Sequence, residues 1–157
     1  MKSLFFVLLA LPLISLADGT KTISEAKAVS ACVNQVGPSS AIACRGVKSL
    51  RQAVAVYSCV TQVGAAAAIA CTGVDSIAEG RIVYACVNQV GAGAAIACTG
   101  AKTLSAGLAV EACVSHVGMK AASSCTGVRT MSEALAVTTC VEYVGLPSAK
   151  ACGPEED

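Results

Sequence analysis

A unit of 27 residues repeats five times along this chain, and every copy carries two cysteines at the same two positions. The copies span 20–46, 47–73, 74–100, 101–127 and 128–154, without an insertion or deletion. A valine follows the first cysteine of every copy, and a Val-Gly pair comes shortly after it. A fixed period of this length is typical of a stacked array of supersecondary units. The repeat therefore predicts a single array domain over 20–154.

The residues before the first repeat read as a targeting segment. Lys2 places a positive charge near the N-terminus. Leu4 to Leu16 then form an apolar run that is too short to span a bilayer comfortably. Ser15-Leu16-Ala17 fits a small-x-small cleavage site with the cut after Ala17, so we assign 1–17 to a signal peptide and 18–19 to a short mature N-terminus. This assignment predicts export, to the periplasm or outside the cell, with no membrane span after cleavage. An uncleaved membrane anchor is the alternative.

All ten cysteines lie in the repeats, and an even number in an exported chain indicates a disulfide framework. Pairing across repeat boundaries, such as Cys44 with Cys59, would leave Cys32 and Cys152 without partners. Pairing inside each repeat uses every cysteine and is favoured: Cys32–Cys44, Cys59–Cys71, Cys86–Cys98, Cys113–Cys125 and Cys140–Cys152. No Cys-x-x-Cys pair occurs and the chain has one histidine, so we expect no metal site and no cofactor.

Each repeat begins with the signature of a helix start. A Ser or Thr stands at the third position of every copy, and three residues later four of the five copies have Glu or Gln. This spacing is that of a capping box, in which the two side chains bind the unpaired amides of the first helical turn. The fourth copy has Ala106 in place of the acid. Apolar residues at helical spacing then lead to a glycine, so we expect a helix of about 14 residues.

A shorter segment follows that glycine, as in 92–98, and its alanine content favours a second helix. An irregular segment or a 3₁₀ turn is the competing interpretation. Since the two segments meet at one glycine, they must run roughly antiparallel, which brings the two cysteines of a repeat within reach of each other. The role of Ser123 and Ser124, which interrupt the apolar pattern in the fourth copy, is not given by the pattern.

A helix pair this small cannot bury its own apolar face, but five stacked pairs can. The predicted fold is therefore all-α, a short α-solenoid of five helix-turn-helix repeats with one disulfide each. The end units should be atypical, and Lys150, which stands where the first three copies have isoleucine, suggests a polar end cap ahead of an acidic tail at 155–157. The chain has no Trp and an interior of small Ala and Val side chains, so its stability should depend on the disulfides.

Two surface columns are candidate binding sites. The first is a tyrosine patch on the polar face of the long helices of the second and third copies, because Tyr and Arg are common interface anchors; it comprises Tyr57, Tyr84, Arg81, Asn88 and Gln89. The second is a basic column just before the long helices, where helix dipoles favour anionic groups; it comprises Lys21, Lys48, Lys102 and Arg129. Tyrosines that merely cover the core, and a solubilising loop edge interrupted by Asp75, are the simpler interpretations.

The sequence offers no set of residues that resembles an active site. The single histidine, His116, has no Ser or Cys partner that could be proposed as a nucleophile. Glu111 and Glu142 lie at unlike positions of neighbouring copies, so a hydrolase that uses them has no further support. The threonine column Thr72, Thr99 and Thr126 is too sparse to favour ice binding. We therefore expect a protein without enzymatic activity.

The favoured function is an exported binding or scaffold protein, by analogy with other solenoids. The partner is expected to be a protein or an envelope component. A formal net charge of +1 gives no bulk attraction to nucleic acid, so none is expected as a partner. The alternative is a structural, protease-resistant envelope or matrix protein without a specific ligand.

Overall fold

The structure is a computed structural model that describes residues 22–154, and within this range the chain is all-helical. Each repeat contributes one α-helix of 14 residues and one 3₁₀ helix of seven, as the solenoid prediction requires. The helices are α1 Ile23–Val36, η1 Pro38–Cys44, α2 Leu50–Val63, η2 Ala65–Cys71, α3 Ile77–Val90, η3 Ala92–Cys98, α4 Leu104–Val117, η4 Met119–Cys125, α5 Met131–Val144 and η5 Leu146–Cys152. The expected signal peptide, the short mature N-terminus and the acidic tail lie outside the described residues.

The five long helices start where the caps predict. In each, the hydroxyl of the Ser or Thr before the helix accepts a hydrogen bond from the amide three residues on. The reciprocal half of the capping box is present in α1 and α5. In α2 and α3 the side chain reaches one residue further back: Gln52 Oε1 accepts from the Lys48 amide at 2.8 Å, and Glu79 Oε2 from the Asp75 amide at 2.9 Å. The amides of these loops are therefore tied to the helix that follows.

The glycine of each Val-Gly pair ends the long helix and turns the chain back. Gly91 has φ 81° and ψ 160°, a conformation that is essentially restricted to glycine. Its amide donates to the Val87 carbonyl at 2.8 Å, which closes the last helical turn before the chain leaves. The other four copies place a glycine in the same conformation at 37, 64, 118 and 145. The helix stop is therefore built identically in every repeat.

The second segment is helical, but it is a 3₁₀ helix rather than an α-helix. Seven residues separate the turn glycine from the residue after the second cysteine, as in Ala92–Cys98. A 3₁₀ helix rises about 2.0 Å per residue and an α-helix about 1.5 Å. The tighter coil lets this short segment run further back along the 14-residue helix beside it. Alanine content predicts a helix here but does not distinguish the two forms.

All five disulfides join cysteines of the same repeat, as predicted, and none crosses a repeat boundary. The Cα atoms of each pair lie 5.7–5.9 Å apart, within the usual range for a bridge. Each bridge ties an α-helix to the 3₁₀ helix that follows it. In the first four repeats both cysteines are buried, so the bridges are part of the core.

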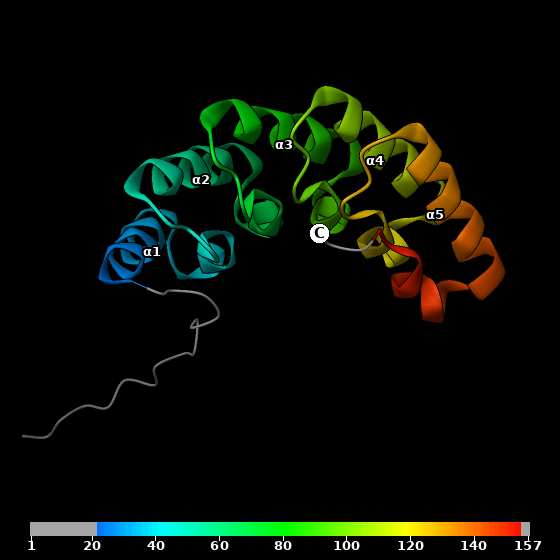
Figure 1. Cartoon of the computed structure of the whole chain (residues 1–157), viewed down its shortest axis with the longest axis horizontal. Helices are drawn as coiled ribbons and strands as arrows, with labels where there is room; N and C mark the ends of the chain where they lie inside the picture. The colour runs from blue at the N-terminus through cyan, green and yellow to red at the C-terminus, as the bar shows by residue number, and fades with distance from the viewer. Residues whose placement is uncertain (1–21, 155–157) are drawn as a thin grey trace, which may run out of the picture.

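The repeats stack side by side into a curved array, with the α-helices on the convex side and the 3₁₀ helices on the concave side (Figure 1). Each α-helix packs against the next α-helix, and each 3₁₀ helix against the next 3₁₀ helix. The core runs along the array between these two layers and consists mainly of Ala, Val and Cys. Ser124 is also buried in it, where its hydroxyl donates to the Ala121 carbonyl at 2.7 Å, whereas Ser123 is exposed.

Candidate functional site

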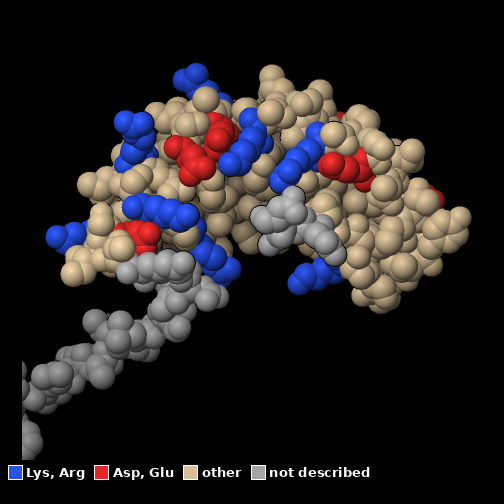
Figure 2. All heavy atoms as spheres, in the orientation of Figure 1, with Lys and Arg blue, Asp and Glu red and all other residues tan. Residues whose placement is uncertain are grey.

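The basic column lies in the exposed loops that lead into the long helices. Lys48, Lys102 and Arg129 are exposed there, and Lys21 lies outside the described residues. Acidic groups share this edge, and Figure 2 shows blue and red side chains close together along the near face. Asp75 accepts a hydrogen bond from Gln52 Nε2 at 2.7 Å and lies 3.7 Å from Lys102 Nζ. One cation of the column is thus already paired with a carboxylate of the preceding repeat.

The tyrosine patch lies on the convex surface of α2 and α3. Tyr57 and Tyr84 are 42% and 37% exposed, and they occupy the same repeat position on two helices that pack together. Arg81 and Asn88 are exposed on α3. The exposed parts of these side chains therefore lie on the surface of the two neighbouring helices.

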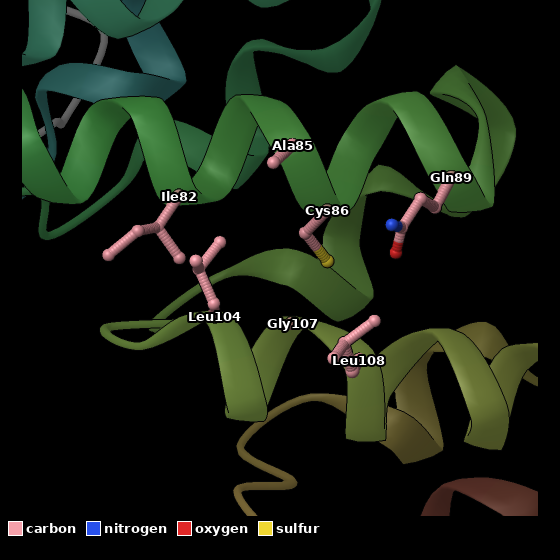
Figure 3. Close-up of a pocket in the computed structure, with 7 residues that line it drawn as sticks. All are labelled: Ile82, Ala85, Cys86, Gln89, Leu104, Gly107 and Leu108. Carbon is pink, nitrogen blue, oxygen red and sulfur yellow. The ribbon is translucent and has the colours of Figure 1, made fainter.

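Gln89, the fifth residue of the patch, belongs to a different feature. It lines a crevice of about 250 Å³ between α3 and α4, together with Ile82, Ala85, Cys86, Leu104, Gly107 and Leu108. In Figure 3 the Gln89 side chain points toward the gap between the two helices, opposite Leu108. Gly107 has no side chain, and this absence helps to open the crevice at its floor. The other side chains of the lining are small or aliphatic. The side-chain amide of Gln89 is therefore the group of this crevice that could make a directed hydrogen bond to a ligand.

The concave face carries a groove of about 290 Å³. One residue column of its lining runs across all five repeats and another across the first four: Ile42, Ile69, Ile96, Ser123 and Lys150, and then Arg45, Thr72, Thr99 and Thr126. We call this feature the concave groove. Its lining contains no acidic residue, and one cation stands in the first repeat and one in the last.

The threonines of the concave groove also join the repeats. Thr72, Thr99 and Thr126 each donate a hydroxyl hydrogen bond of 3.2–3.3 Å to the carbonyl of the isoleucine in the preceding repeat. The hydroxyl hydrogens are therefore used inside the protein, and the lone pairs and methyl groups remain to face a ligand. This arrangement gives the threonine column a structural role that its spacing alone did not reveal.

The concave groove was not among the sites predicted from the sequence. Its isoleucines are partly open to solvent: Ile42 and Ile69 are half-buried, and Ile96 is 37% exposed. Lys150, which the sequence suggests as part of a polar end cap, also lies in this groove in line with those isoleucines. The signal was present in the sequence as one column that changes from apolar to polar along the array, beside a second column that is polar in the first four repeats.

The remaining candidates from the sequence, His116, Glu111 and Glu142, lie on α4 and α5. His116 Nδ1 lies 2.9 Å from the Ala112 carbonyl of its own helix, which is an ordinary surface contact. Glu111 and Glu142 lie on α4 and α5, the first half-buried and the second exposed. Among residues 22–154 no group of three or more His, Cys, Asp or Glu side chains is placed to hold a metal ion. No helix in this part of the chain is long and apolar enough to cross a membrane.

Comparisons with protein-family models, with curated proteins and with solved structures find no match to this chain.

Proposed function

We propose that this chain is an exported binding protein, and that the concave groove holds an extended, mainly apolar segment of a partner protein. The observation that carries the proposal is the groove itself, in which three isoleucines in successive repeats are left partly open to solvent. Half-open aliphatic side chains in a row are a suitable surface for apolar side chains of a partner. The disulfides hold this surface in place without the help of a ligand.

The spacing of the groove favours an extended chain. Packed helices lie about 8–10 Å apart, so equivalent isoleucines of neighbouring repeats repeat at roughly that distance. A polyproline II segment advances about 3.1 Å per residue with three residues per turn, so every third side chain returns to the same face after about 9 Å. An extended partner with an apolar residue at every third position would therefore match Ile42, Ile69 and Ile96 in turn.

The charges of the concave groove favour carboxylates near the ends of the bound segment. Arg45 and Lys150 stand in the first and last repeats, and no acidic residue lies between them in the lining. Both cations are exposed, so each would contribute modestly and in a salt-dependent way. The proposal includes no catalytic step, since it needs only burial of apolar surface and charge pairing.

The test measures binding of labelled peptides with a leucine at every third position and glutamates at both ends, against scrambled peptides of the same composition. Ile96→Lys places a charge in the groove and should weaken binding at least tenfold, or about 1.4 kcal/mol. Lysine already occupies this column in the fifth repeat, so the fold should tolerate the change. Ile77→Lys is the matched control, since Ile77 is 47% exposed at the start of α3 and outside the groove lining.

Equal binding of ordered and scrambled peptides, or an Ile96→Lys variant that binds as tightly as the parent, would refute the groove as the binding site. The tyrosine patch is tested in the same assay by changing both Tyr57 and Tyr84 to alanine. A tenfold loss in that variant, with Ile96→Lys unaffected, would move the binding site to the convex surface. Binding that fades with salt and on Lys102→Ala would instead identify the basic column.

A second candidate function, a structural envelope or matrix protein without a specific ligand, is favoured by a separate observation. The two ends of the array expose apolar side chains at positions that are buried between repeats elsewhere in the array.

A further inference from the structure

Every junction between neighbouring repeats is made from the same two faces. The leading face of a repeat, which meets the repeat before it, carries a small residue and a valine at fixed positions of the long helix; in the first repeat these are Ala26 and Val29. The trailing face, which meets the repeat after it, carries a small or aliphatic residue and the first cysteine; in the last repeat these are Ala136 and Cys140.

The contact between the two faces is visible at the glycines of the leading face. A Cβ placed on Gly80 would lie 3.2 Å from Cys59 Cβ, and one on Gly107 would lie 3.7 Å from Cys86 Cβ. The small residue of the leading face therefore sits directly against the first cysteine of the preceding repeat. At Gly80 even an added Cβ would require the neighbour to shift slightly, whereas at Gly107 it would make an ordinary contact.

Both faces are left open at the ends of the array. The valines equivalent to Val29 in the other repeats are 0–4% exposed, but Val29 itself is only half-buried, and Ala26 is exposed. The first cysteines of the first four repeats are 0–2% exposed, whereas Cys140 is partly exposed and Ala136 fully so. Within residues 22–154, both end faces thus expose apolar side chains where solenoids normally carry a polar outer face.

Two of the most exposed large side chains of the molecule lie where a further junction would cover them. Tyr143 is 88% exposed and Ile23 is 79% exposed. Tyr143 occupies the repeat position of Gln89, which lines a crevice with Leu104, and Leu104 occupies the position of Ile23. If a first repeat followed a fifth repeat, Tyr143 would therefore lie against Ile23.

We infer that this protein associates head to tail with further copies of itself, the trailing face of the fifth repeat of one copy packing on the leading face of the first repeat of the next. The inference is independent of the proposed function, because the concave groove contributes nothing to either face. Four junctions inside the chain already show that the two faces fit, and the intermolecular contact would continue this series.

Such a contact is heterologous, because it joins two different surfaces, and it leaves one unused face at each end of every complex. Heterologous contacts build open fibres, or rings where the rotation closes. The curvature of the array (Figure 1) would then continue from copy to copy. Arg45 of one copy would follow Lys150 of the other along the concave side, so their repulsion should weaken the contact at low salt and screening should strengthen it.

The experiment uses the oxidised exported chain and two variants that each block one face. Ala26→Arg blocks the leading face, and Ala136→Arg blocks the trailing face; both residues are exposed, so neither change disturbs a buried site. Sedimentation velocity should show the parent forming species heavier than the monomer as concentration or salt rises. Each variant alone should remain a monomer, since its own two faces can no longer meet.

The mixture of the two variants gives the decisive result. Ala26→Arg keeps an intact trailing face and Ala136→Arg keeps an intact leading face, so an equimolar mixture should form dimers and nothing larger. Circular dichroism checks that both variants remain helical, and Leu108→Arg on the convex surface should assemble like the parent. A parent that stays monomeric at every concentration, with its end faces covered by its own terminal segments or by nothing, overturns the inference. Variants that assemble alone, or a mixture that stays monomeric while the parent assembles, also overturn it.

Discussion

The hydroxyl of Thr99 donates to the carbonyl oxygen of Ile69 in the preceding repeat, at 3.3 Å, and so links two neighbouring 3₁₀ helices. The same carbonyl also accepts from the Thr72 amide of its own repeat at 3.1 Å. One oxygen thus serves both the closure of its own 3₁₀ helix and the contact to the next repeat. Because the bond recurs at Thr72 and Thr126, stacking on the concave side has a polar component as well as apolar burial.

Thr99→Val should lower the free energy of unfolding by about 1 kcal/mol, since it removes one hydrogen bond and keeps the shape of the side chain. The cost should stay modest because the Ile69 carbonyl keeps its bond from the Thr72 amide. Urea unfolding measures the change, with Thr99→Ser as the control that retains the hydroxyl. If valine and serine have the same effect, the hydroxyl does not contribute to stacking.

Two glycine-to-alanine changes should shift the free energy of unfolding in opposite directions. Gly91→Ala places a side chain at φ 81°, ψ 160°, and should destabilise the fold by about 1–3 kcal/mol. Gly107→Ala lies inside α4, where the new Cβ would meet Cys86 Cβ at an ordinary 3.7 Å, and should stabilise the helix by about 0.5–1 kcal/mol. Thermal melts of the two variants beside the parent test the pair. A stabilising Gly91→Ala would mean that the helix stop does not require glycine.

Ser76→Ala should cost about 1 kcal/mol, because it removes the hydroxyl that accepts from the Glu79 amide at 3.2 Å. Thr103→Ala should cost about as much, although its repeat has Ala106 in place of an acid, because the Ala106 amide still donates to the threonine hydroxyl. Ser132→Ala, at an exposed position in the first turn of α5, is the control that leaves every cap hydroxyl in place. Equal stability of parent and cap variants in chemical denaturation would place the helix start elsewhere.

Non-reducing peptide mapping should find five links, each inside one repeat, and no unpaired thiol. In dilute solution under mild reduction, Cys140 and Cys152 should be the first to react with an alkylating reagent, because both are partly exposed while the other eight cysteines are buried. Full reduction should sharply lower the melting temperature, since each bridge closes a loop of about a dozen residues and contributes roughly 3 kcal/mol in the chain-entropy model. Uniform labelling of all ten cysteines, or a Cys44–Cys59 peptide, would contradict this expectation.

Much of the fold could be predicted because each local signal recurs at the same position in five copies of the repeat. The hydroxyl before each long helix, the Val-Gly pair after it and the even cysteine count fix the helices and the bridges without knowledge of the tertiary structure. Helix type in the second segment could not be predicted, since residues such as Ala94 and Ala97 fit an α-helix and a 3₁₀ helix equally well. The extra reach of Gln52 to the Lys48 amide also depends on the loop geometry rather than on spacing.

The candidate site was harder to predict than the fold. A sequence column shows that Ile42 and Lys150 are equivalent, but it does not show whether that column lies on an end of the array or on its concave side. The structure resolves this by placing the column in the concave groove. The tyrosine patch and the basic column stay predictions, because exposure places Tyr57, Tyr84 and Lys48 on the surface without indicating what they bind.

The confinement of each disulfide to one repeat also bears on how such a chain can change over generations. Since no bridge crosses a boundary, an in-register duplication or deletion of 27 residues in the gene would leave every cysteine with its partner. A scheme that linked Cys44 to Cys59 would expose unpaired thiols at each such event. Array length is therefore free to vary by whole units, and the length of the concave groove would vary with it.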